Sequence, residues 1–312
     1  MLASAAMNIL FASEMEKLQS WLPLLSEALP NDRITSWENY AAAEKIDIAL
    51  VATPPKGALK KLAGVKLIQS LWMGVEGLVG DPDYPRGVPL ARLVDPGMVA
   101  AMSETVLARI LDWHRRHNQY RAQQRERRWL RHNQYMAGDR SVGLLGLGEL
   151  GTDVARKLVT LGFNVAGWSR RPKQIEGVKS FTDLPAMLAA CDAVVCLLPL
   201  TAQTRGILNS RTFSLLKPKS CIINVARGGH VVTEDLLAQL DAGHLSHAYL
   251  DVFEPEPLPA DSPLWSHPKV SITPHTAALT EPRTAVPKIV ENVERARRGE
   301  APLNRVDFEA GY

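Results

Sequence analysis

"LLGLGELGTDVARKL", residues 144–158, places three glycines between an apolar run and an amphipathic segment. Gly146, Gly148 and Gly151 have the spacing G-x-G-x-x-G, which is a weak signal when it stands alone. Here the apolar run 141–146 predicts a strand before the glycines, and the segment after them predicts a helix. In that context the glycines permit a tight turn, a close approach of backbone to a pyrophosphate, and close packing of helix on sheet. The stretch therefore predicts a dinucleotide-binding loop rather than an ordinary strand-to-helix turn.

The residues after the next predicted strand, 163–168, indicate which dinucleotide is bound. An NAD site carries Asp or Glu about 20 residues after the glycines, where it binds the ribose 2′-hydroxyl. This sequence has Ser169, Arg170, Arg171 and, two residues later, Lys173, with no carboxylate. Hydroxyl and guanidinium groups suit a 2′-phosphate, because arginine forms charge-assisted and often bidentate bonds to phosphate. We therefore predict NADPH rather than NADH, with a solvated basic turn as the alternative.

Short β-like runs alternate with helical patterns along the whole chain, which favours parallel sheets flanked by helices. We expect strands at 7–12, 46–52, 65–71, 88–94, 141–146, 163–168, 193–198, 221–226, 248–253 and 270–274. We expect a long helix from Met98 to about Tyr120, a helix with Thr233 as its N-cap, and a last amphipathic helix over about 281–298. The fold class is thus α/β, with a doubly wound dinucleotide-binding (Rossmann) domain at 99–279 and a smaller α/β domain at 1–98.

Composition excludes several other classes of protein. The 312 residues are 46% hydrophobic and 22% charged, as in an ordinary globular protein, and a net charge of +3 is too small to imply nucleic acid. No apolar run approaches the roughly 18 residues of a membrane span. The start lacks a basic region and a long apolar stretch, so we expect no signal peptide and an unstructured leader at residues 1–6. Cys191, Cys196 and Cys221 lie in apolar runs without a C-x-x-C pair, which indicates reduced thiols, no metal site and a cytoplasmic location.

Chemically capable residues follow three of the later strands. Arg227 follows the run 221–226, an acidic group lies within and after the run 248–253, and His275 follows 270–274. Ligands of a doubly wound sheet bind beyond the carboxyl ends of its strands, so these residues are candidates for one site. The acidic group consists of Asp251, Glu254 and Glu256. His230 also follows a strand and is, on position alone, a rival to His275 as an acid.

The segments LGLGELG, NVARG, LDVFEPEPLP, SPLW and TPHTAALT, in this order and approximate spacing, resemble the D-isomer-specific 2-hydroxyacid dehydrogenase family. The resemblance covers the central domain and extends more loosely to LWMGVEG (71–77) and DFEAGY (307–312). It implies two α/β domains, of which the smaller is flavodoxin-like and is completed by the C-terminal segment 280–312. It also implies a homodimer and the reduction of small 2-oxo acids, glyoxylate or hydroxypyruvate first.

The resemblance assigns the catalytic roles to Arg227, Glu256 and His275. A planar guanidinium suits both the carboxylate and the ketone of a 2-oxo acid. A protonated His275 can donate to the ketone oxygen as hydride reaches the carbon, and Glu256 beside it would stabilise the imidazolium. The alternative for each residue is a structural role in its loop.

The resemblance also implies binding residues. Backbone N–H groups of Gly74 and Val75 would bind the substrate carboxylate, and Trp72 and Met73 would favour a small substrate or, alternatively, pack into the core. Met73 and Glu76 depart from the pattern common in relatives, which leaves substrate preference open. The expected cofactor contacts are Gly146, Gly148, Glu149, Leu150, Gly151, Ser169, Arg170, Arg171, Pro199, Thr204, Ala226, Asp251 and Ala277.

Three other functions remain as alternatives. Regulatory NAD(P)H-binding corepressors share this pattern, and formate or phosphite could replace the 2-oxo acid, although formate dehydrogenases carry Gln at the position of Glu256. The run 114–132 has seven arginines with Tyr120 and Trp129 interleaved, as in some nucleic-acid-binding segments. We instead expect no nucleic-acid partner, because the run fits a solvated helix end followed by an arm that reaches a dimer partner.

Overall fold

The computed structural model describes residues 6–41 and 44–311, so the predicted leader lies outside the described part except for Ala6. The chain divides into two compact units. One comprises the chain up to Met98 together with the segment from Thr280 onward, and the other comprises Val99–Leu279. Among the described residues, no helix is both long and apolar enough to cross a membrane.

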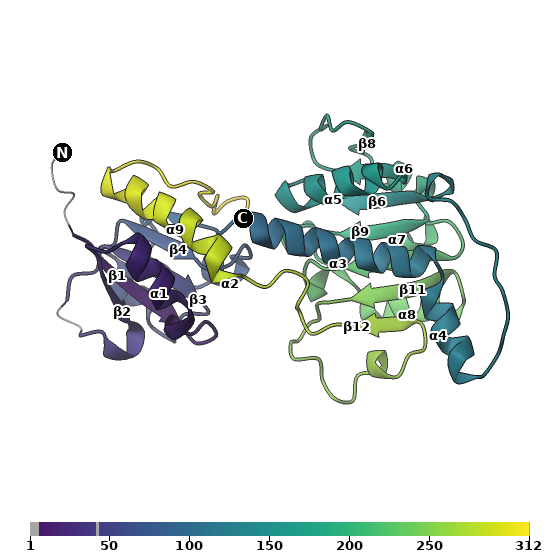
Figure 1. The fold of residues 1–312 in the computed structure, drawn as a ribbon, viewed down its shortest axis with the longest axis horizontal. Helices are drawn as coiled ribbons and strands as arrows, with labels where there is room; N and C mark the ends of the chain where they lie inside the picture. Colours follow the sequence, from purple (N-terminus) through teal and green to yellow (C-terminus); the bar gives the residue numbers. More distant parts are fainter. Residues whose placement is uncertain (1–5, 42–43, 312) are drawn as a thin grey trace. The chain divides into compact units, whose positions relative to one another are not determined.

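The unit Val99–Leu279 is built on a seven-stranded sheet in which every paired strand is parallel (Figure 1). The order is β12-β11-β10-β9-β6-β7-β8. Within this sheet the chain forms β6 first and adds β7 and β8 on one side of it. It then crosses to the other side and adds β9 to β12 there, so the topological switch point lies between β6 and β9. The strands are β6 (Ser141–Leu145), β7 (Asn164–Trp168), β8 (Val178–Phe181), β9 (Ala193–Cys196), β10 (Ser220–Asn224), β11 (Leu245–Leu250) and β12 (Val270–Ile272).

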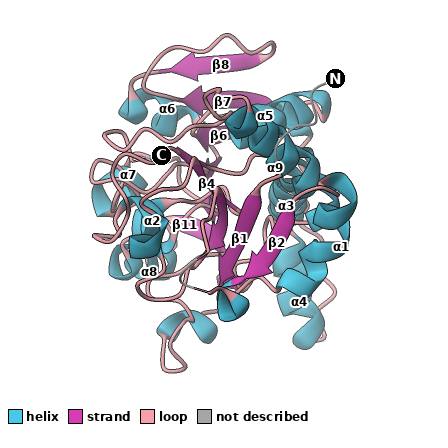
Figure 2. Cartoon of the chain, turned by 90° about the vertical axis from the view of Figure 1, so that its left-hand side faces the viewer, coloured by secondary structure: helices cyan, strands magenta, loops and turns pink. Residues whose placement is uncertain are grey.

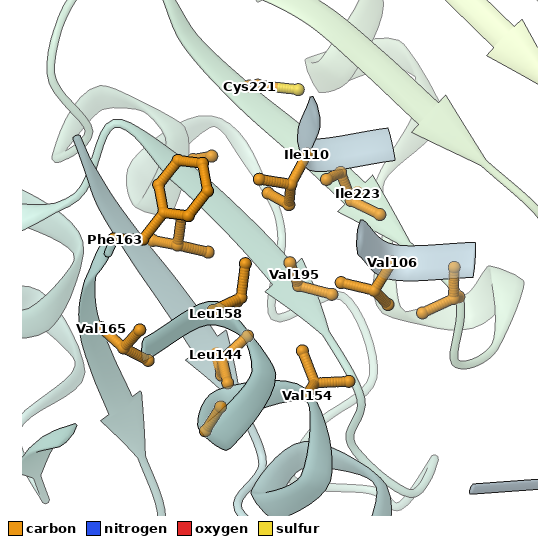
Figure 3. Packing of buried hydrophobic residues seen from close by; sticks show 14 of the residues in the cluster. Val106, Ile110, Leu144, Val154, Leu158, Phe163, Val165, Val195, Cys221 and Ile223 are labelled. Atoms are coloured by element: carbon orange, nitrogen blue, oxygen red, sulfur yellow. The ribbon is translucent and has the colours of Figure 1, made fainter. Parts of the chain in front are cut away.

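Helices cover both faces of this sheet. The helices are α3 (Pro96–His114), which starts at the end of the first unit, α4 (His117–Arg125), α5 (Glu149–Thr160), α6 (Leu184–Ala190), α7 (Ser210–Ser214) and α8 (Thr233–Asp241). On one face, apolar side chains of α3 and α5 interlock with those of the strands, as Figure 3 shows for Val106, Ile110, Leu144, Val154, Leu158 and Val195. On the other face, α6, α7 and α8 bury Met187, Phe213, Leu236 and Leu240 against the alternate strand residues. This arrangement confirms the doubly wound α/β class.

The first unit contains a smaller, wholly parallel sheet in the order β2-β1-β3-β4-β5, of which Figure 2 labels β1, β2 and β4. This order is that of flavodoxin-like folds, as expected. Its strands are β1 (Asn8–Ser13), β2 (Arg33–Ser36), β3 (Ile48–Ala52), β4 (Leu67–Ser70) and β5 (Leu90–Ala91), and its helices are α1 (Leu18–Ala28), α2 (Glu76–Val79) and α9 (Pro282–Arg297).

The C-terminal helix α9 packs beside α1 although the two come from opposite ends of the chain (Figure 1). Arg297 of α9 forms a 2.6 Å ion pair with the buried carboxylate of Asp32. Asn292 donates a 2.7 Å hydrogen bond to Gln69 of β4, and both side chains are buried. Buried charged and polar groups need such partners, so these contacts fix the register of α9 on its unit.

Several expected boundaries were wrong. The helix predicted from Met98 to Tyr120 is interrupted, because Arg116 adopts a left-handed conformation with φ 58° between α3 and α4. Thr233 is the first residue of α8 rather than its cap, which is Val232. Strand β11 starts three residues earlier than predicted and ends before Asp251. Five short 3₁₀ turns complete the description: Trp37–Asn39, Leu59–Leu62, Ala137–Asp139, Gly228–His230 and Pro263–Trp265.

Candidate active site

The glycine loop lies at the switch point of the larger sheet. Gly146 follows β6 with φ +102°, and a Cβ there would lie 3.0 Å from the carbonyl oxygen of Leu197, just beyond β9. Helix α5 begins at Glu149 with Gly148 as its N-cap. In the described chain, no group accepts a hydrogen bond from the backbone N–H of Glu149, Leu150 or Gly151. These N–H groups and the positive end of the helix dipole form a binding place for phosphate.

Two glycines of the loop face different surroundings. A Cβ at Gly151 would lie 2.0 Å from the carbonyl oxygen of Gly146, so no side chain fits there without moving the loop backbone. A Cβ at Gly148 would meet nothing within 4 Å. Gly151 is thus required by the fold of the loop itself, whereas Gly148 leaves its open side free for a ligand.

This difference yields a matched pair of variants. We expect Gly151→Ala to lower the free energy of unfolding by about 1–3 kcal/mol, because overpacking forces backbone to shift. We expect Gly148→Ala to leave thermal unfolding unchanged and to weaken NADPH binding at least tenfold, since the methyl group would enter the space of the pyrophosphate. Thermal denaturation without cofactor and fluorescence titration with NADPH measure the two effects. Equal destabilisation by both variants would contradict this account of the loop.

A basic turn follows β7, the strand next to β6. Ser169 donates a 2.6 Å hydrogen bond to the carbonyl oxygen of Arg171, and Arg170 and Arg171 are exposed. The ammonium of Lys173 donates to the carbonyl oxygen of Leu147 at 2.6 Å, which ties the turn directly to the glycine loop. Lys173 belongs to this cationic edge although the sequence alone did not single it out as a binding residue.

His275 and Glu256 form a hydrogen-bonded pair beyond the carboxyl ends of β12 and β11. The distance between His275 Nδ1 and Glu256 Oε2 is 2.8 Å, and the other carboxylate oxygen accepts a 2.8 Å hydrogen bond from the backbone N–H of Phe253. With a carboxylate at Nδ1, that nitrogen carries the proton, so Nε2 is the nitrogen left to exchange protons with a ligand. The side chain of His275 is 48% exposed.

Asp251 braces the loop that carries His275. Its side chain accepts hydrogen bonds from the Thr273 hydroxyl at 2.6 Å and from the backbone N–H groups of Thr276 and Ala277, each at 2.9 Å. Its carbonyl oxygen accepts a further bond from the His275 backbone N–H at 2.7 Å. Asp251 is only 2% exposed, and Ala277 is buried. In this structure both expected cofactor contacts support the unusual left-handed backbone of His275, whose φ is 54°.

Arg227 is brought to the same edge by close packing of two loops. A Cβ at Gly228 would lie 2.0 Å from the backbone carbon of Phe253, so the loop after β10 touches the loop after β11. Glu254 of that second loop forms a bidentate pair with Arg205, at 2.5 and 3.1 Å. Of the two glutamates, therefore, Glu256 is the one paired with His275.

His230, the rival acid, is fully buried. Its Nδ1 lies 3.0 Å from the carbonyl oxygen of Arg227 and its Nε2 lies 3.3 Å from that of Pro199. Both ring nitrogens thus face protein backbone, which is no position for a general acid. Thr204 also bonds to this carbonyl, because its hydroxyl donates to Pro199 at 2.7 Å. Pro199, Thr204 and the residues after β10, including Ala226, therefore share one hydrogen-bonded region.

In the first unit, the expected substrate loop follows β4. Val75 is buried, whereas Trp72, Met73 and Gly74 are partly exposed. No described group accepts a hydrogen bond from the backbone N–H of Gly74 or Val75, as an anion-binding loop requires. The indole N–H of Trp72 donates to Glu16 at 2.9 Å, so Glu16 sets the orientation of the indole. Glu16 was not foreseen from the sequence, because it comes from the loop after β1.

The arginine-rich run has a mixed structure. Arg121 forms a bidentate pair with Asp112 at 2.7 Å across the break between α3 and α4. Beyond α4 the chain is largely without helix or strand up to residue 136, and Trp129 there is 94% exposed.

No cluster of potential metal ligands occurs among the described residues. The three cysteines are buried, and burial raises the pKa of the Cys191 and Cys196 thiols to about 12.

Fold and site together define the class: a two-unit α/β protein with a Rossmann-type sheet and a His–Glu pair beyond the carboxyl ends of its strands. The family described as "D-isomer specific 2-hydroxyacid dehydrogenase, NAD binding domain" matches residues 107–277. The chain belongs to the D-isomer specific 2-hydroxyacid dehydrogenase family, which confirms the resemblance stated above.

Similar proteins cover nearly the whole chain. The glyoxylate/hydroxypyruvate reductase A of Yersinia enterocolitica is 41% identical, over 98% of this chain and 100% of the relative. A D-isomer specific 2-hydroxyacid dehydrogenase from Xanthobacter autotrophicus, solved with NADPH and MES, is 41% identical with a TM-score of 0.95, covering 99% of this chain and 100% of that one. An NADPH-dependent glyoxylate/hydroxypyruvate reductase from Sinorhizobium meliloti, solved with NADP and sulfate, is 35% identical with a TM-score of 0.91, covering 98% and 100%.

Proposed function

We propose that this protein is an NADPH-dependent reductase of the glyoxylate/hydroxypyruvate reductase A type, which converts small 2-oxo acids to 2-hydroxy acids. The observation that carries the proposal is the 2.8 Å pair between His275 and Glu256 at the strand ends of a Rossmann sheet. Full-length relatives with this name and relatives solved with NADP or NADPH support it.

The described residues fit NADPH at two places. The N–H groups at the start of α5, for which the described chain offers no acceptor, lie beside the open side of Gly148 and suit the pyrophosphate. Ser169, Arg170 and Arg171 with Lys173 suit the 2′-phosphate, and no carboxylate opposes them in this turn. Bound there, NADPH supplies the hydride of the reaction.

The protein groups have distinct roles in this proposal. Arg227 binds the substrate carboxylate and the neighbouring carbonyl oxygen through its planar guanidinium. His275, charged and held by Glu256, donates its Nε2 proton to the oxygen on which negative charge develops. Gly74 and Val75 bind the substrate carboxylate through backbone N–H groups, and Trp72 with Met73 limits substrate size. We further propose that the enzyme is a cytoplasmic homodimer in which the arm with the exposed Trp129 meets the partner.

The test is the oxidation of NADPH and of NADH, followed at 340 nm, with glyoxylate and with hydroxypyruvate. We expect turnover with NADPH and at least tenfold lower kcat/KM with NADH. In the double variant Arg170→Ala/Arg171→Ala the preference for NADPH should fall at least tenfold while kcat with NADH is retained. Efficient use of NADH by the unaltered protein would overturn the 2′-phosphate site, and binding of NADPH without turnover of either acid would overturn the reductase.

A further inference from the structure

The carbonyl oxygen of Arg227 is held by three hydrogen bonds. The side-chain amide of Asn224 donates to it at 2.9 Å, and the backbone N–H of His230 donates at 3.2 Å. The third partner is Nδ1 of the His230 ring, at 3.0 Å. Asn224 and His230 are both fully buried, and the amide oxygen of Asn224 also accepts from the Ala226 backbone N–H at 3.2 Å.

The same histidine ring reaches a second loop. Its Nε2 lies 3.3 Å from the carbonyl oxygen of Pro199, and the backbone of His230 accepts a 2.9 Å hydrogen bond from Leu208. A neutral imidazole has one N–H, so it can donate to only one of the two carbonyl oxygens at a time. The shorter contact is the one to Arg227, which favours the tautomer with the proton on Nδ1.

We propose that His230 and Asn224 are positioning residues that clamp the backbone of Arg227 through its carbonyl oxygen. This inference rests on the proposed function, because it concerns the delivery of Arg227 to the 2-oxo acid. A side chain that must contact two substrate groups at once requires a fixed backbone, and an error of about 1 Å in such a position can cost about 10²-fold in rate. Neither residue touches the substrate in this proposal.

Three substitutions of His230 separate its two ring contacts, that of Nδ1 with Arg227 and that of Nε2 with Pro199, from its volume. The amide nitrogen of asparagine lies near the position of histidine Nδ1, so His230→Asn keeps the bond to Arg227 and loses the contact with Pro199. The amide nitrogen of glutamine lies nearer the position of Nε2, so His230→Gln does the reverse. His230→Phe keeps the ring and loses both. Asn224→Asp independently replaces the amide donor by an acceptor at nearly constant size.

We expect kcat/KM for glyoxylate to fall 10- to 100-fold in His230→Phe, His230→Gln and Asn224→Asp, and less than threefold in His230→Asn. The Kd of NADPH should change less than threefold in all four variants, because its phosphate sites lie in other loops. Thermal unfolding of each variant shows which of them are folded.

Calorimetric binding of oxalate, an unreactive dicarboxylate, to the NADPH-loaded protein provides a readout besides turnover, with weaker binding expected in the same three variants. Unchanged substrate kinetics in folded His230→Phe or Asn224→Asp would overturn the clamp. A uniform loss in all four variants that follows their thermal stability would also overturn it, since that result indicates a merely structural role. Absence of turnover in the unaltered protein would refute the proposed function alone, because oxalate binding would still decide on the clamp.

Discussion

Replacement of His275 by asparagine should lower kcat for glyoxylate by about 10²–10⁴-fold, the usual contribution of a general acid. Asparagine is the suitable substitution for two reasons. It tolerates the left-handed backbone of this position, where φ is 54°, and its amide can keep the contact with Glu256 that Nδ1 makes at 2.8 Å. What is removed is the Nε2 donor.

The Kd of NADPH for His275→Asn should stay within about threefold of the value for the unaltered protein. The reason is that the ring of His275 lies beyond the carboxyl end of β12 and not at the glycine loop. His267→Gln is the matched control, since His267 pairs with Asp241 at 3.2 Å and is not among the site residues. Its kcat should be unchanged. Turnover of His275→Asn within tenfold of the unaltered protein would remove His275 from the role of proton donor.

The pattern of the larger sheet could be predicted from the sequence because its central strands are continuous apolar runs separated by glycine turns. One edge strand of each sheet was missed for the complementary reason. The segments RITS (β2) and VKSF (β8) are short and only partly buried, so they lack the apolar run that reveals a buried strand. The break at Arg116 was missed because the polar sequence after Trp113 carries no stripe that distinguishes one helix from two.

The sequence predicts which residues follow the strands that form the site, but it does not predict the hydrogen bonds that these residues make. Arg227, Glu256 and His275 follow three strands that turn out to be adjacent, and a parallel sheet brings such ends to one edge. The partners of buried groups depend instead on how loops fold back. The carboxylate of Asp251 accepts three hydrogen bonds from residues 273–277, and no pattern in the sequence pointed to these partners. His230 reaches Pro199 across 31 positions, which no local pattern encodes.

Replacement of Arg227 by alanine should lower kcat/KM for glyoxylate by about 10²–10³-fold, comparable to the loss of one preorganised donor to a developing charge. Lysine should restore little of this loss, because an ammonium lacks the planar pair of donors that meets a carboxylate and the neighbouring carbonyl oxygen together. The backbone of residue 227 is extended, with φ −144°, so alanine and lysine fit it without strain. Steady-state kinetics with glyoxylate measure the effect, and Arg211→Ala, at an exposed position of α7, is the control that should keep full activity.

A comparison of two substrates distinguishes a role of Arg227 in binding the carboxylate from a general role in the fold. Glycolaldehyde has a carbonyl group but no carboxylate, so its slow reduction loses only the contact of Arg227 with the carbonyl oxygen and should depend on Arg227 less than the reduction of glyoxylate does. The ratio of kcat/KM between the two substrates should therefore fall at least tenfold in Arg227→Ala. An equal loss with both substrates would indicate that Arg227 acts only on the carbonyl oxygen or on the structure of its loop, and not on the carboxylate. An unchanged kcat/KM for glyoxylate would remove Arg227 from the site, and the clamp at His230 would then have no substrate-binding side chain to position.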